Sequence, residues 1–312
     1  PNAVCLSDRA VEVVRRFVRA GGGLVASHGS SLVQDDFRRR KDFALGDLFR
    51  ARYIGSIPVT QRSEALQLNL PKGNFLGDDP LILSQTSTAW RNPSGSPPER
   101  GPLAMIASAS EVEAREGGTV LATFRVNDPK RSAKEFPAVI TSSYGKGRVV
   151  YFAAAVDKAM FFYPDAAFRR MLVSSCRWAA GDVPPPVEVH GPLILATTFR
   201  RQPREGRTIV HLLNHGSSWG QHSIYQKIAP LPEELRKEYG YPDRSELRGT
   251  WPIREEVIPL HDIRVTCRIS RVKKATLQPE NRDLPLRKVK DGVEVLVPKV
   301  EMHSMVVFDH SP

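Results

Sequence analysis

The chain has 312 residues, of which 41% are hydrophobic and 25% charged, a composition that excludes disordered and collagen-like classes. No apolar run approaches the roughly 20 residues of a membrane-spanning helix, so we expect no membrane partner. The net charge of +11 divides into 25 basic and 18 acidic side chains in residues 1–183 and 20 and 16 in residues 184–312, and this even spread predicts no nucleic-acid partner.

The first elements along the chain form one α/β unit. The sequence begins at Pro1 without a methionine, in residues typical of the end of a strand, so we expect a C-terminal part of a longer protein. Residues 7–20 predict a helix that Ser7 can cap, and Gly21–Gly23 let the backbone leave it before a buried strand at 24–27. The apolar face of this helix is formed by Val11, Val14, Phe17 and Val18.

Helices and strands continue to alternate as far as residue 183. Residues 144–147 form a glycine-bounded reversal, which indicates a hairpin between the strands on either side of it. The other expected elements are helices at 42–49 and 166–179 and strands at 52–54, 103–106, 119–126, 137–140 and 148–153. This alternation predicts an α/β domain over residues 1–183.

The pattern changes after three consecutive prolines at 184–186, which can neither continue a helix nor donate to a sheet. About seven short β segments follow without helices between them, separated by Pro, Gly and Asp turns, and this is typical of an all-β sandwich over residues 187–312. A long insertion at 215–254 interrupts the strands and is rich in aromatic residues. Insertions of this length are often functional or interfacial.

The loop after the first strand is the first place to look for chemistry, because ligands of open α/β sheets bind beyond the carboxyl ends of strands. His28 and Ser30 lie there, but the glycine framing of a nucleophile elbow is missing and residues 1–183 contain no second histidine. A loop that packs or forms hydrogen bonds is therefore the favoured interpretation. A small Ser/His hydrolase centred on His28 and Ser30 remains an alternative.

Other candidate residues give equally weak signals. The acidic pairs are sequence neighbours in polar segments, so they do not predict the opposed carboxylates of a glycosidase. His261 lies in a strand-like run and is expected to be structural or, less often, a sugar contact. Trp219 and Trp251 of the insertion can stack on sugar rings, as in a carbohydrate-binding module, or cover a subunit contact. The three cysteines are scattered, so we predict neither a metal site nor a cofactor.

Several motifs together resemble a known family. Those of the first domain are the Gly21–Val25 unit and the segments 42–49 and 144–152, and those of the second are 211–214, 258–265 and 297–303. The first set is similar to the β-galactosidase trimerisation domain, and the second resembles the β-sandwich that ends such glycosyl hydrolases. The resemblance implies a flavodoxin-like, glutamine-amidotransferase-like open sheet. It implies no amidotransferase activity, because the elbow reads Ser27-His28-Gly29 where the active enzymes carry cysteine.

The resemblance also implies a partner and a role. Such domains follow a TIM-barrel catalytic domain, and a barrel of about 250 residues has no room in this sequence. We therefore expect no catalytic residue in this chain, which would be a non-catalytic region of a glycoside hydrolase that packs beside a missing N-terminal barrel. We further expect a homo-oligomer assembled through the first domain, with carbohydrate as a further binding partner.

Overall fold

A computed structural model gives the fold, and it describes residues 2–59, 66–80, 82, 102–126, 134–162, 165–181, 183–192, 194–214 and 257–310. These residues form two compact units, one ending at Val183 and the other beginning at Pro184. The first unit mixes helices and strands, whereas the second is built from strands in the part that the structure describes. Each unit has its own hydrophobic core.

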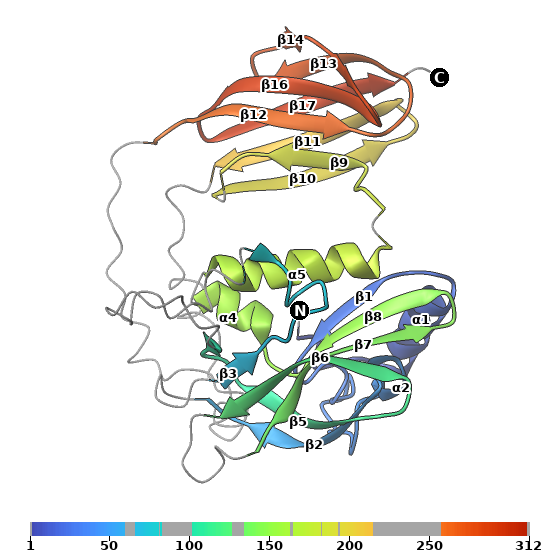
Figure 1. Ribbon diagram of the computed structural model, residues 1–312. Helices are drawn as coiled ribbons and strands as arrows, with labels where there is room; N and C mark the ends of the chain where they lie inside the picture. Colours follow the sequence, from blue (N-terminus) through green and yellow to red (C-terminus); the bar gives the residue numbers. More distant parts are fainter. Residues whose placement is uncertain are drawn as a thin grey trace, which may run out of the picture. The chain divides into compact units, whose positions relative to one another are not determined.

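The first unit is organised by a six-stranded sheet in the order β1-β8-β7-β6-β3-β4 (Figure 1). Its strands are β1 (Leu24–Ser27), β3 (Leu66–Asn69), β4 (Leu103–Met105), β6 (Gly118–Val126), β7 (Phe136–Tyr144) and β8 (Gly147–Phe152). β1 and β8 are parallel, and the other pairs are antiparallel. A separate antiparallel pair consists of β2 (Ala51–Ile57) and β5 (Ala109–Ala114).

The described residues of this unit include four helices: α1 (Asp8–Arg19), α2 (Gly46–Phe49), α4 (Val156–Phe162) and α5 (Ala166–Ala179). α5 contacts β1 and β8, and α1 also packs on β8 (Figure 1). α1 begins where the sequence predicts it, because the Ser7 hydroxyl accepts a hydrogen bond from the Ala10 N–H at 3.2 Å. It ends before Gly21, whose φ of 117° is open to glycine and strained for other residues.

One expected core residue of α1 is on the surface instead. Val11 and Val18 are buried, but the Phe17 side chain is 57% exposed. The Phe17 ring covers the backbone at the helix end, since a Cβ added to Gly22 would lie 2.3 Å from Phe17 Cε1. The apolar spacing was therefore correct for the valines, while the phenylalanine covers a glycine that has no side chain of its own.

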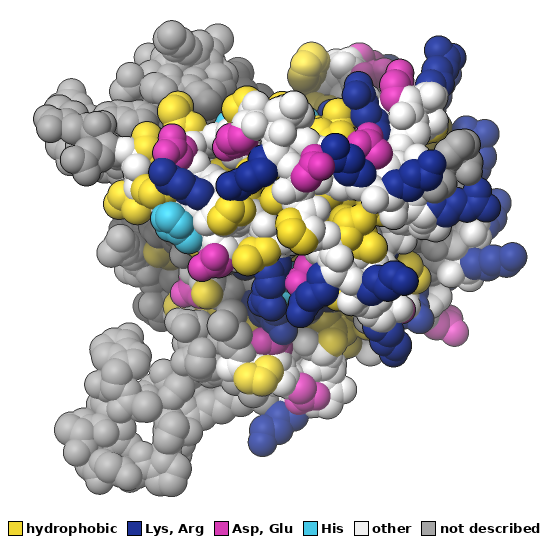
Figure 2. Space-filling model, turned by 90° about the horizontal axis from the view of Figure 1, so that it is seen from above, with side chains coloured by type: hydrophobic (Ala, Val, Ile, Leu, Met, Phe, Trp, Pro, Cys, Tyr) yellow, Lys and Arg dark blue, Asp and Glu magenta, His cyan; other side chains and the backbone are white. Residues whose placement is uncertain are grey.

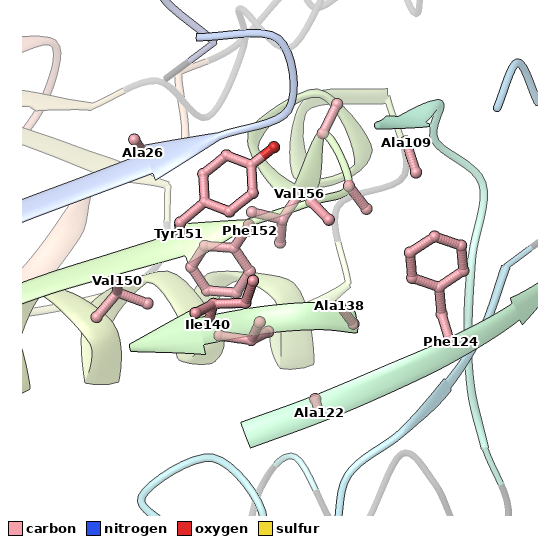
Figure 3. Close-up of a cluster of buried hydrophobic side chains, with 14 of the residues drawn as sticks. Ala26, Ala109, Ala122, Phe124, Ala138, Ile140, Val150, Tyr151, Phe152 and Val156 are labelled. Atoms are coloured by element: carbon pink, nitrogen blue, oxygen red, sulfur yellow. The ribbon is translucent and has the colours of Figure 1, made fainter. Parts of the chain in front are cut away.

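The core of the first unit contains a cluster of aromatic rings around Tyr151 of β8. The Tyr151 and Phe49 rings are stacked with centroids 4.6 Å apart, and Phe43 meets Tyr151 edge-on at 5.3 Å. Figure 3 shows Tyr151 and Phe152 of β8 beside Ala26 of β1, and the Tyr151 hydroxyl is the labelled oxygen-bearing group of this hydrophobic cluster. This packing fixes the two parallel strands whose carboxyl ends carry the candidate site.

The second unit consists of two antiparallel sheets. The five-stranded sheet has the order β10 (Leu195–Gln202), β11 (Arg207–Asn214), β17 (His303–His310), β13 (Val272–Gln278) and β14 (Arg282–Leu284). The four-stranded sheet has the order β15 (Arg287–Val289), β16 (Gly292–Val300), β12 (Leu260–Cys267) and β9 (Val187–His190). Alternate side chains of both sheets are buried in one shared core, as in a sandwich.

The fold class predicted from the sequence, an open α/β sheet followed by an all-β sandwich, is confirmed. The sheet of the first unit is more antiparallel than the flavodoxin-like pattern implies, because β1–β8 is the one parallel pair among its described strands. The sequence did not indicate β3, β5, β14 or β15. All four are six residues or shorter and contain charged or polar side chains, so their apolar pattern is weak.

Candidate functional site

The candidate site is the loop that follows β1, where the sequence places His28. The His28 N–H donates to the Phe152 carbonyl at 2.7 Å, which extends the parallel β1–β8 pairing by one residue. The His28 carbonyl in turn accepts a hydrogen bond from the Tyr151 hydroxyl at 2.8 Å. Its φ of 49° is left-handed, so the chain turns sharply at this residue, at the carboxyl ends of two parallel strands.

The His28 ring is enclosed by protein. The residue is 3% exposed, and its Nδ1 lies 3.2 Å from Nδ2 of the Asn2 side chain. The pKa of His28 is lowered to about 4. Burial is the main cause and the positive charge of Lys158 adds to it, while Asp157 opposes the shift. At neutral pH the ring is therefore uncharged, and Nδ1 accepts the hydrogen bond that the Asn2 amide donates.

A carboxylate in the first turn of α4, which follows β8, connects this loop to the start of the chain by hydrogen bonds. The Asp157 side chain accepts from the Ser27 hydroxyl at 2.7 Å and from the Asn2 N–H at 3.1 Å. Lys158 is adjacent, and burial lowers the pKa of its ammonium group to about 8, while Asp157 opposes that shift. The site thus joins residues from three segments of the chain.

Asn2, Asp157 and Lys158 were missed by sequence reasoning. Asp157 and Lys158 follow β8, which the sequence places in a hairpin with β7 but not beside β1. The missing signal was the parallel β1–β8 pairing, because two parallel strands bring their carboxyl ends to the same edge. Asn2 arrives by a third route, since residues 3–6 run alongside the loop and form hydrogen bonds with residues 30–33.

The two serines of the loop build the turn and face inward. The Ser30 hydroxyl donates to the Ser27 carbonyl at 2.7 Å and accepts from the Ala3 N–H at 3.2 Å. The Ser31 hydroxyl accepts from the Leu45 N–H at 3.1 Å. Both residues are at least 98% buried, so a substrate cannot reach either oxygen in this arrangement. These contacts support the packing interpretation of the loop over a Ser/His hydrolase.

The remaining candidates of the sequence are not brought to this loop by any described contact. His261 lies exposed on β12 of the second unit. Trp219 and Trp251, with the whole insertion at 215–254, lie outside the described residues, and so does the expected carbohydrate contact of these side chains. The structure therefore describes three of the five candidates: His28, Ser30 and His261.

The described residues offer neither a cluster of metal ligands nor a membrane-spanning helix. These residues contain no group of three or more His, Cys, Asp or Glu side chains close enough to share a metal ion. None of the described helices combines the length and apolar character needed to cross a membrane. The polar groups of the loop after β1 form hydrogen bonds with one another and with the start of the chain.

Comparison with known proteins places the fold. No protein-family model matches the sequence, and no curated protein matches it either. Solved structures do: an α-L-fucosidase isoenzyme 2 from Paenibacillus thiaminolyticus is similar over 100% of this chain and 40% of its own, with 19% identity and a TM-score of 0.59. A β-galactosidase from Bacillus circulans sp. alkalophilus is similar over 99% of this chain and 32% of its own, with 11% identity and a TM-score of 0.55.

A cold-adapted β-galactosidase from Rahnella sp. R3 gives the same picture, with 98% of this chain and 31% of its own covered, 14% identity and a TM-score of 0.53. The chain therefore spans between about a third and two fifths of the length of these enzymes. Both units fall within one match in each case. The chain thus has the fold of a portion of glycoside hydrolases.

Proposed function

We propose that this chain is a non-catalytic C-terminal region of a glycoside hydrolase of the β-galactosidase type, with residues 1–183 and 187–312 as its two domains. The observation that carries the proposal is the asymmetry of coverage. Nearly all of this chain aligns with the solved enzymes, whereas 60% or more of each enzyme lies outside the alignment. That remainder is large enough to hold a catalytic barrel of about 250 residues.

The acidic side chains of the described residues support a non-catalytic role. Glycoside hydrolysis needs two carboxyl groups about 5 to 10 Å apart with a sugar between them. Asp157 instead accepts two internal hydrogen bonds, and Asp79 is buried against the Arg170 guanidinium at 2.5 Å. Carboxylates held in this way stabilise the fold.

Activity measurements test this part of the proposal. We expect the purified chain to show no turnover of nitrophenyl galactosides or fucosides, and a longer protein that includes the residues before Pro1 to show it. Glu255 and Glu256 lie outside the described residues and form an acidic pair. Turnover by the chain alone that is lost in Glu255→Gln or Glu256→Gln would contradict the proposal.

The second part of the proposal is that residues 1–183 mediate self-association. Specific interfaces are enriched in aromatic and arginine side chains. The first unit exposes Phe37 to 82%, next to Arg38 and Arg39, and this combination is typical of a contact surface. Phe161–Tyr163 is a second aromatic run in the sequence of residues 1–183, and its side chains lie outside the described set.

Light scattering at tens of micromolar tests the assembly. We expect a defined oligomer that dissociates in Phe37→Ser or Phe162→Ser, depending on which aromatic side chain lies in the interface. Phe199→Ser is a matched control, because Phe199 is an exposed phenylalanine of the second unit. A strict monomer, or an oligomer lost only in the control variant, would remove self-association through residues 1–183.

A further inference from the structure

Two histidines of the second unit meet on the surface of its five-stranded sheet. His211 lies on β11 and His303 on β17, which are adjacent and antiparallel. The β11 neighbours of His211, Val210 and Leu212, are buried in the sandwich core. Since side chains alternate between the faces of a strand, the His211 ring is on the outer face of the sheet, and His303 meets it there.

The contact between the two rings is short and specific. His211 Nδ1 lies 3.2 Å from His303 Nε2, with ring centroids 5.4 Å apart and ring planes 11° from parallel. One ring must donate the proton that the other accepts, because two unprotonated ring nitrogens repel each other at this distance. His303 is exposed to solvent, so this hydrogen bond contributes little to the stability of the fold.

We propose that His211 and His303 form a binding site for a divalent transition-metal ion, copper(II) above all. Two metal–nitrogen bonds of about 2.0–2.1 Å, at an angle somewhat wider than a right angle, span about 3.0–3.4 Å. The observed 3.2 Å separation falls within that range. The ion replaces the shared proton, and the exposed His303 ring turns so that its lone pair points at the metal.

The surroundings of the pair favour copper among the divalent ions. Imidazole ligands suit zinc, nickel and copper, and affinities for nitrogen sites peak at copper(II). Met305 lies directly opposite His211 in the β11–β17 register, and cross-strand partners share a face. Its thioether is thus placed to act as a third, soft ligand, which copper accepts and which the harder divalent ions accept poorly. Water completes the coordination.

The other described histidines differ in ways that matter for the test. His310 uses both ring nitrogens, one with the Thr208 hydroxyl at 2.9 Å and one with the Ser270 carbonyl at 3.1 Å. His28 is buried. His261 is exposed on β12, where its cross-strand partner is Lys299, which makes it a matched control for a single surface imidazole.

Titration calorimetry with copper(II) chloride in a weakly coordinating buffer tests the site on the whole chain. His215 and His222 lie outside the described residues, so a background variant carrying His215→Asn and His222→Asn removes their contribution. In this background we expect one tight site that weakens at least tenfold in His211→Asn and in His303→Asn. His261→Asn should leave the affinity unchanged, and Met305→Leu should weaken it by a smaller factor.

A second readout separates ligation from loss of fold. The electron paramagnetic resonance spectrum of the bound copper should show hyperfine structure from two nitrogens, reduced to one in either single variant that still unfolds like the parent protein. An affinity within threefold of the parent value in both His211→Asn and His303→Asn would overturn the site. The same conclusion would follow from equal weakening in His261→Asn, because copper would then bind any exposed histidine.

Discussion

Histidines occupy opposite environments in the two units. His28 follows a strand of the first unit, turns the chain in a left-handed conformation and is buried, with a pKa lowered to about 4. His211 and His303 of the second unit lie on regular strands, and their rings meet at the surface. His28, at the strand end where catalytic residues are often found, is thus buried. His211 and His303 lie on the outer face of a regular sheet, where we propose that they bind an ion.

The difference follows from how each environment satisfies its polar groups. Around His28, the side chains of Asn2, Ser27, Ser30 and Asp157 form hydrogen bonds with the loop and with one another. On the outer face of β11 and β17, His303 is exposed to solvent and His211 is partly exposed. A strand end therefore indicates where a site can form, while burial and hydrogen bonding decide whether it is open to a ligand.

The largest expected effect comes from removing the ring that supports the His28 loop. Tyr151→Ala should lower the free energy of unfolding of the first unit by about 3–5 kcal/mol, because it leaves a cavity beneath Phe43 and Phe49. Tyr151→Phe keeps the ring and removes the hydrogen bonds of the hydroxyl, with the His28 carbonyl and with Ser110, so it should cost about 1–2 kcal/mol. Urea denaturation followed by circular dichroism measures both, and equal losses in the two variants would contradict this account.

The next effect is a pH dependence caused by His28. Its pKa is about 4 in the folded chain and about 6.5 when unfolded, so between these values the unfolded chain binds more protons. The free energy of unfolding should therefore be full near pH 7 and fall by about 2 kcal/mol by pH 5, with further loss toward pH 4.

His28→Asn isolates this contribution, since asparagine tolerates the left-handed conformation and does not titrate. The variant should lose less stability between pH 7 and pH 5 than the parent chain, and denaturation at several pH values measures the difference. His211→Asn is the control from the other unit. If parent and His28→Asn chains respond identically to pH, the His28 ring is not buried as a neutral group.

A smaller effect distinguishes a structural Ser30 from a nucleophile. Ser30→Ala removes the hydrogen bonds to Ser27 and Ala3 and should cost about 1 kcal/mol, whereas Ser143→Ala, at an exposed position near the end of β7, should cost almost nothing. A fluorophosphonate probe should label neither the parent chain nor these variants. Labelling that disappears in Ser30→Ala would instead support the hydrolase alternative.

The smallest effect on the free energy of unfolding is expected at the surface histidines, where the side chains are proposed to bind an ion and contribute little to the fold. Without metal, His211→Asn and His303→Asn should change the free energy of unfolding by no more than about 0.5 kcal/mol, as is usual for surface substitutions. With copper(II) at 100 times its dissociation constant, the parent chain should gain about 2.7 kcal/mol that both variants lack. Thermal unfolding with and without the ion measures this, and a metal-free loss above 2 kcal/mol would indicate a structural pair.

The sequence by itself determined the elements with a strong local pattern. The Ser7 cap, the glycines after α1, the 144–147 reversal and the α5 helix depend on neighbouring residues, and each was predictable from its own segment. The change from α/β to all-β at the prolines was likewise predicted from composition and periodicity. Local propensity and side-chain spacing are sufficient for such features, because their energetics involve residues within a few positions of one another.

Tertiary structure alone decided the candidate sites. Ser27 and Asp157 are 130 positions apart and His211 and His303 are 92 apart, so neither pair has a signal in the spacing of nearby residues. The first pair exists because β8 reverses from β7 and then lies parallel to β1, and the second because β17 lies beside β11. Strand order and burial set the charge of His28 and the meeting of the surface histidines, since both depend on which distant segments the core brings together.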